Sequence, residues 1–421
     1  MIDYKVKTLP NGLRIITAPI KTSEAVTVFI LAGVGGRFEN KKLNGISHLV
    51  EHLFFKGSKN YPDAATINKE FDSLGANYNA FTGSEYTGFY IQSAAQDFEK
   101  SFALLSDMFL NPLFPENEFE KEKAVVLEET KYRHDMPQWL IHVLSQKGIF
   151  GDQPIGMDIS GETETVKAFK HSDIVSYYQT YYRPSSSIVV ISGNPKGFDW
   201  EKIVEKAFSS FKHQETPKFE PYQAIKPEKL VSRIKKVDQT HFSFSVLTYP
   251  REDAKNYALA LLVTILAGGS SSRLFTKIRE EKGWAYDVRS DVSAYHDTGT
   301  VSIYGGLMQD KVAETMKIIS EEITDLKTNG PDAEELERAK KNLRGHLALS
   351  LEDSMEIASF LADEIFYLKS IRTPEEIVDA WNKVTAEDIQ KIAQEVFQSG
   401  KMGLALIGPK DYQKELNGIL N

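Results

Sequence analysis

Two histidines and a glutamate stand close together near the N-terminus, in the segment His48-Leu49-Val50-Glu51-His52. Apolar residues recur at helical spacing between positions 45 and 55, which predicts a helix. On a helix, His48 and His52 are one turn apart on the same face, where two imidazoles can bind one Zn²⁺. Glu51 shares that face with His48, so its carboxylate can act as general base on a water molecule at the metal. The spacing therefore predicts a hydrolytic zinc site.

A catalytic zinc ion usually has three protein ligands and one open position, so a third ligand is expected. The chain has no cysteine, which excludes thiolate zinc sites, disulfides and thiol nucleophiles and leaves a carboxylate as the natural candidate. The predicted helix 116–132 is rich in glutamate. Glu122 and Glu129 are seven residues apart on one face, so one can bind the metal while the other supports the site. Spacing alone leaves open whether Glu129 or its neighbour Glu128 is the ligand.

The elements that must position these residues fall into two similar halves. The segment 213–229 contains three prolines among polar and charged residues and is a linker candidate. On its N-terminal side, a predicted helix begins at Asp173 and is followed by an apolar strand and a glycine. The same series recurs 215 residues later, from Asp388. This repetition predicts a duplicated unit in tandem.

Each half has the element order of an α+β domain, with strands, then helices, then strands again. We therefore expect each half to form a mostly antiparallel sheet that is covered by helices. The zinc-binding domain is expected to span residues 1–212, and its homologue to span residues 230–421.

Composition narrows the class of protein further. With 421 residues, 41% hydrophobic and 26% charged, the chain has the composition of a globular protein of two or three domains. A net charge of −9 argues against a general binder of nucleic acid or of an anionic membrane. No stretch reaches the roughly 18 apolar residues of a membrane span, and the N-terminal segment has no features of a secretion signal. We therefore expect a cytoplasmic protein.

The inverted His-x-x-Glu-His order is the inverzincin signature, and here it lies within the longer segment 45–57. Together with Leu9-Pro10-Asn11-Gly12-Leu13 and stretches along nearly the whole chain, it resembles the pitrilysin/insulysin family of zinc metallopeptidases. The similarity is to the half-length type, which includes the mitochondrial processing peptidase β-subunit and its bacterial homologues. In that family the third ligand is a Glu separated from the second His by about 76 residues, the separation of His52 and Glu129 here. The resemblance therefore implies Glu129 as ligand and Glu122 as a supporting residue.

A second group of residues lies in the other half, where Gly268-Gly269-Ser270-Ser271-Ser272 precedes Arg279 and Tyr286. The Gly/Ser stretch lacks the Gly-Lys-Ser/Thr ending of a phosphate-binding loop, which argues against nucleotide binding. The family resemblance implies that Arg279 and Tyr286 clamp the substrate carbonyl, where donors stabilise the developing oxyanion. The alternative is a surface ion pair for Arg279 and a half-buried strand position for Tyr286.

A third candidate is the predicted strand that begins after Gly75 and includes Asn79 and Ala80. In the resembling family this strand forms the sheet edge beside the zinc, where the substrate adds as an extra β-strand. The resemblance therefore implies that Asn79 and Ala80 contact the scissile segment. Backbone pairing of this kind tolerates many substrate sequences.

The function implied is that of a zinc metalloendopeptidase with one Zn²⁺ per chain, which cleaves peptides or unfolded polypeptide segments. Half-length members of the family pair as dimers, so a homodimer is implied, with the second domain of one chain facing the zinc domain of the other. Arg279 and Tyr286 would then act in trans. The alternatives are a non-proteolytic peptide-binding or structural subunit, and the active half of a heterodimer.

Overall fold

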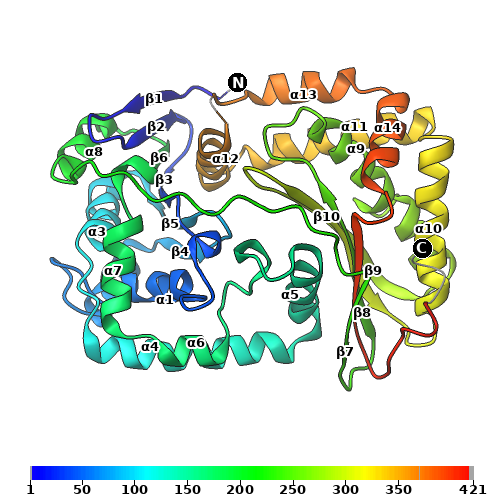
Figure 1. The fold of residues 1–421 in the computed structure, drawn as a ribbon. Coiled ribbons are helices and arrows are strands. Elements are labelled where there is room, and N and C mark those ends of the chain that lie inside the picture. Colours follow the sequence, from blue (N-terminus) through cyan, green and yellow to red (C-terminus); the bar gives the residue numbers. More distant parts are fainter. Residues whose placement is uncertain (1, 369, 417–421) are drawn as a thin grey trace. The chain divides into compact units, whose positions relative to one another are not determined.

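The computed structural model describes residues 2–368 and 370–416. Each of its two compact units is built around one β-sheet with helices packed on it (Figure 1). Unit 1 consists of Met1–Thr130, Asp158–Glu220 and Ala348–Arg372. Unit 2 consists of Lys131–Met157, Pro221–Leu347 and Thr373–Asn421. The predicted α+β class, with two similar sheet-and-helix units, is confirmed.

The sheet of unit 1 has six strands in the order β1-β2-β6-β3-β5-β4. All neighbours are antiparallel except β2 and β6, which run parallel. The strands are β1 (Lys5–Thr8), β2 (Arg14–Pro19), β3 (Ala25–Ala32), β4 (Asn77–Thr82), β5 (Thr87–Ala94) and β6 (Ser187–Gly193). Strand β4 is therefore an edge of the sheet.

The central strands of unit 1 are apolar on both faces, because each face is covered by helices. In β3, Val28 and Ile30 pack into the larger core, whereas Phe29 and Leu31 point to the opposite face and pack with α12 (Ser354–Tyr367). The other helices of this unit are α1 (Ile46–Leu53), α2 (Ala64–Leu74), α3 (Phe98–Leu110), α6 (Thr163–Ala168), α7 (His171–Tyr181) and α8 (Trp200–Phe208). Helix α4 (Glu116–Asp135) begins in unit 1 and ends in unit 2.

The sheet of unit 2 has five strands in the order β7-β11-β8-β10-β9, with only β7 and β11 parallel. The strands are β7 (Leu230–Ile234), β8 (Thr240–Thr248), β9 (Ala285–Ala294), β10 (Gly299–Leu307) and β11 (Met402–Gly408). The helices are α5 (Pro137–Phe150), α9 (Asn256–Ala267), α10 (Val312–Thr328), α11 (Ala333–Ser350, whose last residues belong to unit 1), α13 (Pro374–Lys383) and α14 (Ala386–Val396). Among the described residues, no helix is long and apolar enough to cross a membrane.

The units differ from the contiguous division into 1–212 and 230–421 because two helices are exchanged. Helix α5 comes from the first half of the chain and packs on β8 and β11 of unit 2. Helix α12 comes from the second half and packs on β2, β3 and β6 of unit 1, as Figure 1 shows. The spacing of apolar residues along a helix predicts that one face is buried, but it does not predict which sheet that face packs on.

Candidate metal centre

The structure brings His48, His52 and Glu129, which all belong to unit 1, together from helices α1 and α4. One ligand atom of each residue lies within 4.8 Å of the others. The Nε2 atom of His52 is 3.4 Å from Oε2 of Glu129, and Nε2 of His48 is 3.9 Å from the same oxygen. Both histidines lie on α1, one turn apart, and Glu129 lies on α4.

These atoms suit a zinc ion in kind and number. Two imidazole nitrogens and one carboxylate form the ligand set of a catalytic zinc with an open position for water. Within residues 2–368 and 370–416, no other group of three or more His, Cys, Asp or Glu side chains lies close enough together to hold a metal ion. Helical spacing could not choose between Glu128 and Glu129 as the third ligand. In the structure the cluster contains Glu129, whereas Glu128 is exposed.

Glu122 stands behind His52 and is buried. Its Oε2 is 3.2 Å from Nδ1 of His52, and its Oε1 accepts a hydrogen bond from Lys56 Nζ at 2.8 Å. A proton on Nδ1 that is shared with Glu122 leaves the Nε2 lone pair of His52 for a metal. Carboxylates in this relation to a ligand histidine orient the ring and increase its basicity. The structure thus puts Glu122 in contact with a candidate ligand, in the position of a supporting residue.

The electrostatics of the cluster favour positive charge. Burial by itself lowers the pKa of His52, but hydrogen bonds to Glu122 and Glu129 and the charge of Glu51 outweigh burial and raise this pKa to about 9. Burial likewise raises the pKa of Glu122, yet His52 and Lys56 outweigh it and hold the pKa of this carboxyl below its ordinary value. Three carboxylates around two imidazoles therefore form an environment that stabilises a cation.

Glu51 lies on α1 between the two histidines, and its carboxylate is held by a neighbouring strand. Thr82 Oγ1 donates a 2.6 Å hydrogen bond to Oε2 of Glu51. Thr82 is the last residue of β4, so the edge strand and the metal-binding helix meet at this contact. Sequence reasoning assigned no role to Thr82. The only signal for Thr82 in the sequence was its position, as a polar residue at the end of a predicted strand.

Asn79 and Ala80 lie in the middle of β4, at the edge of the unit 1 sheet. The side chain of Asn79 is exposed, and its Oδ1 accepts a hydrogen bond from the backbone N–H of Ala80 at 2.9 Å. On its other side, β4 pairs with β5 along its whole length. Both residues therefore lie on a strand whose outer edge is open to pairing.

The start of α1 is held by Glu39, a buried residue that the sequence analysis did not single out. Its two carboxylate oxygens accept hydrogen bonds from the backbone N–H groups of Gly45 at 2.7 Å and Ser47 at 2.8 Å. Asn44 Nδ2 donates a longer bond of 3.3 Å. Gly45 itself has a φ of +95°, and a Cβ there would lie 2.7 Å from the Cα of Gly161. Glu39 thus satisfies free N–H groups of the helix that carries both histidines.

Glu39 leads to a prediction about pH and stability. Burial raises the pKa of Glu39 to about 7, although the donors from Gly45, Ser47 and Asn44 oppose this shift. Because the folded protein holds this proton more tightly than the unfolded chain, its contribution to stability is full below about pH 4.5 and is lost as the pH rises to about 7. We expect a loss of about 3 kcal/mol of unfolding free energy over that interval.

The measurement compares the wild type with Glu39→Gln, which cannot ionise, by chemical denaturation of both metal-free proteins at about pH 5 and pH 8. The wild type should lose stability relative to the variant at the higher pH. A difference between the two proteins that stays constant with pH would contradict the ionisation of Glu39.

Arg279 and Tyr286 belong to unit 2 and lie next to each other. Arg279 is in the π-helical segment Phe275–Glu281, a geometry often found at functional sites. Its guanidinium carbon is 5.1 Å from the centroid of the Tyr286 ring and 4.7 Å from that of Phe275. Its Nε also lies 3.6 Å from Glu280, an ion pair as the alternative interpretation expected. Tyr286, however, is 77% exposed rather than half-buried.

Both side chains line a cavity of about 430 Å³ in unit 2, which also includes Gly268, Gly269 and Ser270. The Gly/Ser stretch and the Arg/Tyr pair, which are separate in the sequence, thus contribute to one site. The volume of this cavity falls within the roughly 300–1,000 Å³ that is usual for ligand pockets.

Comparison with known proteins identifies the family. Residues 14–161 match the family model for insulinase, peptidase family M16, and residues 168–343 match the model for the peptidase M16 inactive domain. An uncharacterized zinc protease of Bacillus subtilis is 35% identical over 408 residues, which are 96% of this chain and 97% of the relative. The chain belongs to peptidase family M16. A second M16 relative, an uncharacterized zinc protease of Rickettsia felis, is 32% identical over 413 residues, 97% of this chain and 98% of its own.

Solved structures agree with the M16 fold. A protease from Helicobacter pylori aligns with a TM-score of 0.89 and 23% identity over 97% of this chain and 100% of its own. The structure described as the peptidase M16 inactive domain from Pseudomonas fluorescens also aligns with a TM-score of 0.89, at 18% identity over 97% of this chain and 98% of its own. At this level of identity the likeness concerns the fold. The predicted resemblance to half-length members of the family is confirmed.

Proposed function

We propose that this chain is a zinc-dependent metalloendopeptidase that hydrolyses peptides or unfolded polypeptide segments. The observation that carries the proposal is the cluster of His48, His52 and Glu129, with Glu51 between the two histidines on the same helix. The M16 relatives from Bacillus subtilis and Rickettsia felis, which are named as zinc proteases, support it. The intact ligand set argues against a non-proteolytic subunit, the alternative drawn from the sequence.

The reaction assigns a separate task to each residue. A zinc ion held by His48, His52 and Glu129 would activate a water molecule and polarise the substrate carbonyl. Glu51, which is held by Thr82, accepts a proton as the water oxygen bonds to the carbonyl carbon. The same carboxylate then delivers the proton to the amide nitrogen as the C–N bond breaks.

The outer edge of β4 offers the substrate its backbone pairing. An extended peptide that adds beside Asn79 and Ala80 would extend the sheet by one strand, with its N–H and C=O groups bound to those of β4. Because β4 also carries Thr82, a substrate on this edge comes close to the residue that holds Glu51. This placement explains why the enzyme would accept unfolded segments and reject folded proteins, whose strands are already paired.

The proposal is tested with an internally quenched peptide. The zinc-loaded wild type should cleave an internal bond, as mass spectrometry of the products can establish, and Glu51→Gln should leave the peptide intact. Equal rates for the two proteins would refute the proposed role of this cluster.

We further propose that the active form is a homodimer in which Arg279 and Tyr286 of one chain serve the zinc site of the other. The motif His-x-x-Glu-His occurs once in the sequence, so each chain has one candidate zinc site and one Arg/Tyr pair. Donors from this pair would stabilise the oxyanion at the carbonyl under attack. Two other arrangements compete with this homodimer. In one, Arg279 and Tyr286 serve the zinc site of their own chain, and in the other the chain forms a heterodimer with a different partner.

Complementation distinguishes these arrangements. We expect Glu51→Gln chains and Tyr286→Phe chains, each weakly active alone, to regain activity when they are unfolded, mixed and refolded together. In such mixed dimers, one site combines an intact Glu51 with an intact Tyr286 from the other chain. No gain over the separately refolded variants would rule out the trans arrangement.

A further inference from the structure

The two helices that carry the candidate zinc ligands, α1 and α4, are connected by residues that the proposed reaction does not use. Among the described residues, α1 packs mainly on β4 and α7 rather than along α4, so other contacts must set the distance between His52 and Glu129. Residues 54–59, which directly follow α1, contact the segment 111–115, which directly precedes α4. These contacts connect the end of one metal-binding helix to the start of the other.

Backbone hydrogen bonds hold the two segments side by side. The N–H of Leu113 donates to the carbonyl of Gly57 at 3.0 Å, and the N–H of Lys59 donates to the carbonyl of Asn111 at 3.1 Å. Between these bonds, Ser58 and Pro112 form a single antiparallel bridge outside the six-stranded sheet. The chain that leaves α1 is therefore bonded to the chain that enters α4.

An aromatic contact adds to this pairing. The rings of Phe54 and Phe114 meet edge to face with centroids 5.6 Å apart, and both residues are buried. Phe114 has a φ of +45°, a left-handed conformation that is unfavourable for residues other than glycine, and Nε2 of His171 lies 2.6 Å from its carbonyl oxygen. A strained backbone of this kind persists only where the surrounding structure holds it, and such residues cluster at functional sites.

Lys56 provides a polar contact between the 54–59 segment and α4. Its Nζ lies 2.8 Å from Oε1 of Glu122, while Oε2 of the same carboxylate lies 3.2 Å from Nδ1 of His52. The carboxylate of Glu122 is thus held between a lysine and a candidate zinc ligand. Without Lys56, one of its two oxygens would lose this partner and the carboxylate would be freer to rotate away from His52.

We propose that Lys56 and Phe114 are positioning residues of the metal centre, which fix the carboxylate of Glu122 and the start of α4 relative to the histidines on α1. Because a helix rises about 1.5 Å per residue, Glu129 lies about 20 Å from the start of α4, and a tilt of about 5° there would move it by about 2 Å. Metal sites require ligand distances that are correct to within about 0.2 Å. This inference rests on the proposed zinc site but does not depend on the proposed hydrolysis.

The experiment measures the zinc affinity of the full chain by competition with a chromophoric chelator, a readout that needs no peptide cleavage. Lys56→Met keeps the length of the side chain but removes its charge, and should bind zinc about tenfold more weakly, as is usual when a residue that supports a ligand is lost. Lys56→Arg can still donate to Glu122 and should retain most of the affinity. Lys121→Met is the matched control and should bind zinc like the wild type, because Lys121 is an exposed residue of α4 that pairs with Glu118.

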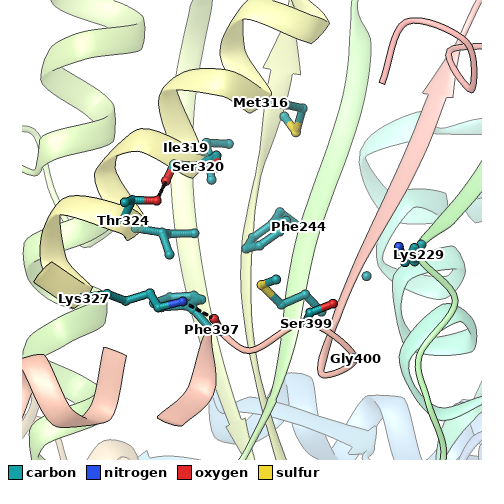
Figure 2. A pocket seen from close by; sticks show the side chains of 13 residues that line it. Lys229, Phe244, Met316, Ile319, Ser320, Thr324, Lys327, Phe397, Ser399 and Gly400 are labelled. Carbon is teal, nitrogen blue, oxygen red and sulfur yellow. Dashed lines mark hydrogen bonds between the residues drawn. The ribbon is translucent and has the colours of Figure 1, made fainter. Parts of the chain in front are cut away.

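Phe114→Leu removes the ring contact with Phe54 and should also weaken zinc binding about tenfold. Two controls each remove one buried ring elsewhere. Phe102→Leu lies in the core of unit 1, and Phe397→Leu lies beside the cavity of unit 2 that Figure 2 shows. Both controls should lose stability in chemical denaturation, as Phe114→Leu does, yet bind zinc like the wild type.

Three results would overturn the inference while leaving the proposed zinc site intact. These are wild-type affinity in Lys56→Met, wild-type affinity in Phe114→Leu, and an equal loss of affinity in the control variants. A wild type that binds zinc no better than Glu129→Gln would instead refute the zinc site itself, and the positioning role would fall with it.

Discussion

Glu51→Gln is expected to reduce kcat/KM for an internally quenched peptide by about 10²–10⁴-fold, the usual contribution of a general acid–base group. Glutamine has nearly the same size as glutamate but cannot accept the proton of the attacking water. The amide oxygen can still accept the hydrogen bond that Thr82 now donates to Glu51, so the local structure should persist. The loss should therefore lie in kcat, with little change in KM.

The zinc content of Glu51→Gln separates this interpretation from simple loss of the site. Because the three candidate ligands are unchanged, the variant should bind as much zinc as the wild type. A Glu51→Gln protein that had lost its zinc would show that the residue acts through the metal site, and one with wild-type activity would show that the base lies elsewhere.

The second large effect is expected for Glu129→Gln, which replaces a charged ligand by a neutral amide. Outer residues that support a ligand typically contribute 10–100-fold to metal affinity, and removal of a ligand should cost more. Glu129 also contacts His52 at 3.4 Å, so its loss leaves two imidazoles without their shared carboxylate. We expect the purified variant to lose zinc on dialysis against a weak chelator and to lose hydrolysis with it.

Glu128→Gln is the matched control for this experiment. It removes the same charge from the adjacent position of α4, where the side chain is exposed and outside the metal cluster. Zinc retention and activity should equal those of the wild type. If instead Glu128→Gln lost zinc and Glu129→Gln kept it, the assignment of the third ligand would be wrong.

Local patterns in the sequence were sufficient for the elements that carry the metal centre. The helical periodicity around His48 and along 116–132 predicted α1 and α4, because an amphipathic helix repeats its apolar positions over a few residues. The predicted helix at 45–55 is shorter in the structure, where α1 ends at Leu53 and a 3₁₀ turn, Phe54–Lys56, follows. The choice of Glu129 over Glu128 required family resemblance, since both are compatible with the same helix.

Glu122 was predicted from the resemblance, but other buried charged residues near these elements could not be predicted, because their contacts join distant segments. Arg37 and Glu85 form a fully buried ion pair, at 2.5 Å, between the segment after β3 and the β4–β5 turn. Neither residue belongs to a motif, and a charged residue is usually exposed. In the sequence Glu39 also resembles an ordinary surface carboxylate, and only the structure shows that it binds the backbone at the start of α1. The exchange of α5 and α12 could not be predicted for a similar reason, since the apolar face of a helix does not indicate which sheet it packs on.

One measurement on one set of samples tests the central claim, that the His48, His52 and Glu129 cluster is the zinc site of a peptidase. Zinc content and peptide hydrolysis are measured together as metal-free wild type, Glu51→Gln and Glu129→Gln proteins are titrated with Zn²⁺. We predict that wild-type activity rises until one zinc is bound per chain, that Glu51→Gln binds the same zinc without activity, and that Glu129→Gln does neither. Full hydrolysis by the metal-free wild type, or by zinc-saturated Glu51→Gln, would contradict the claim.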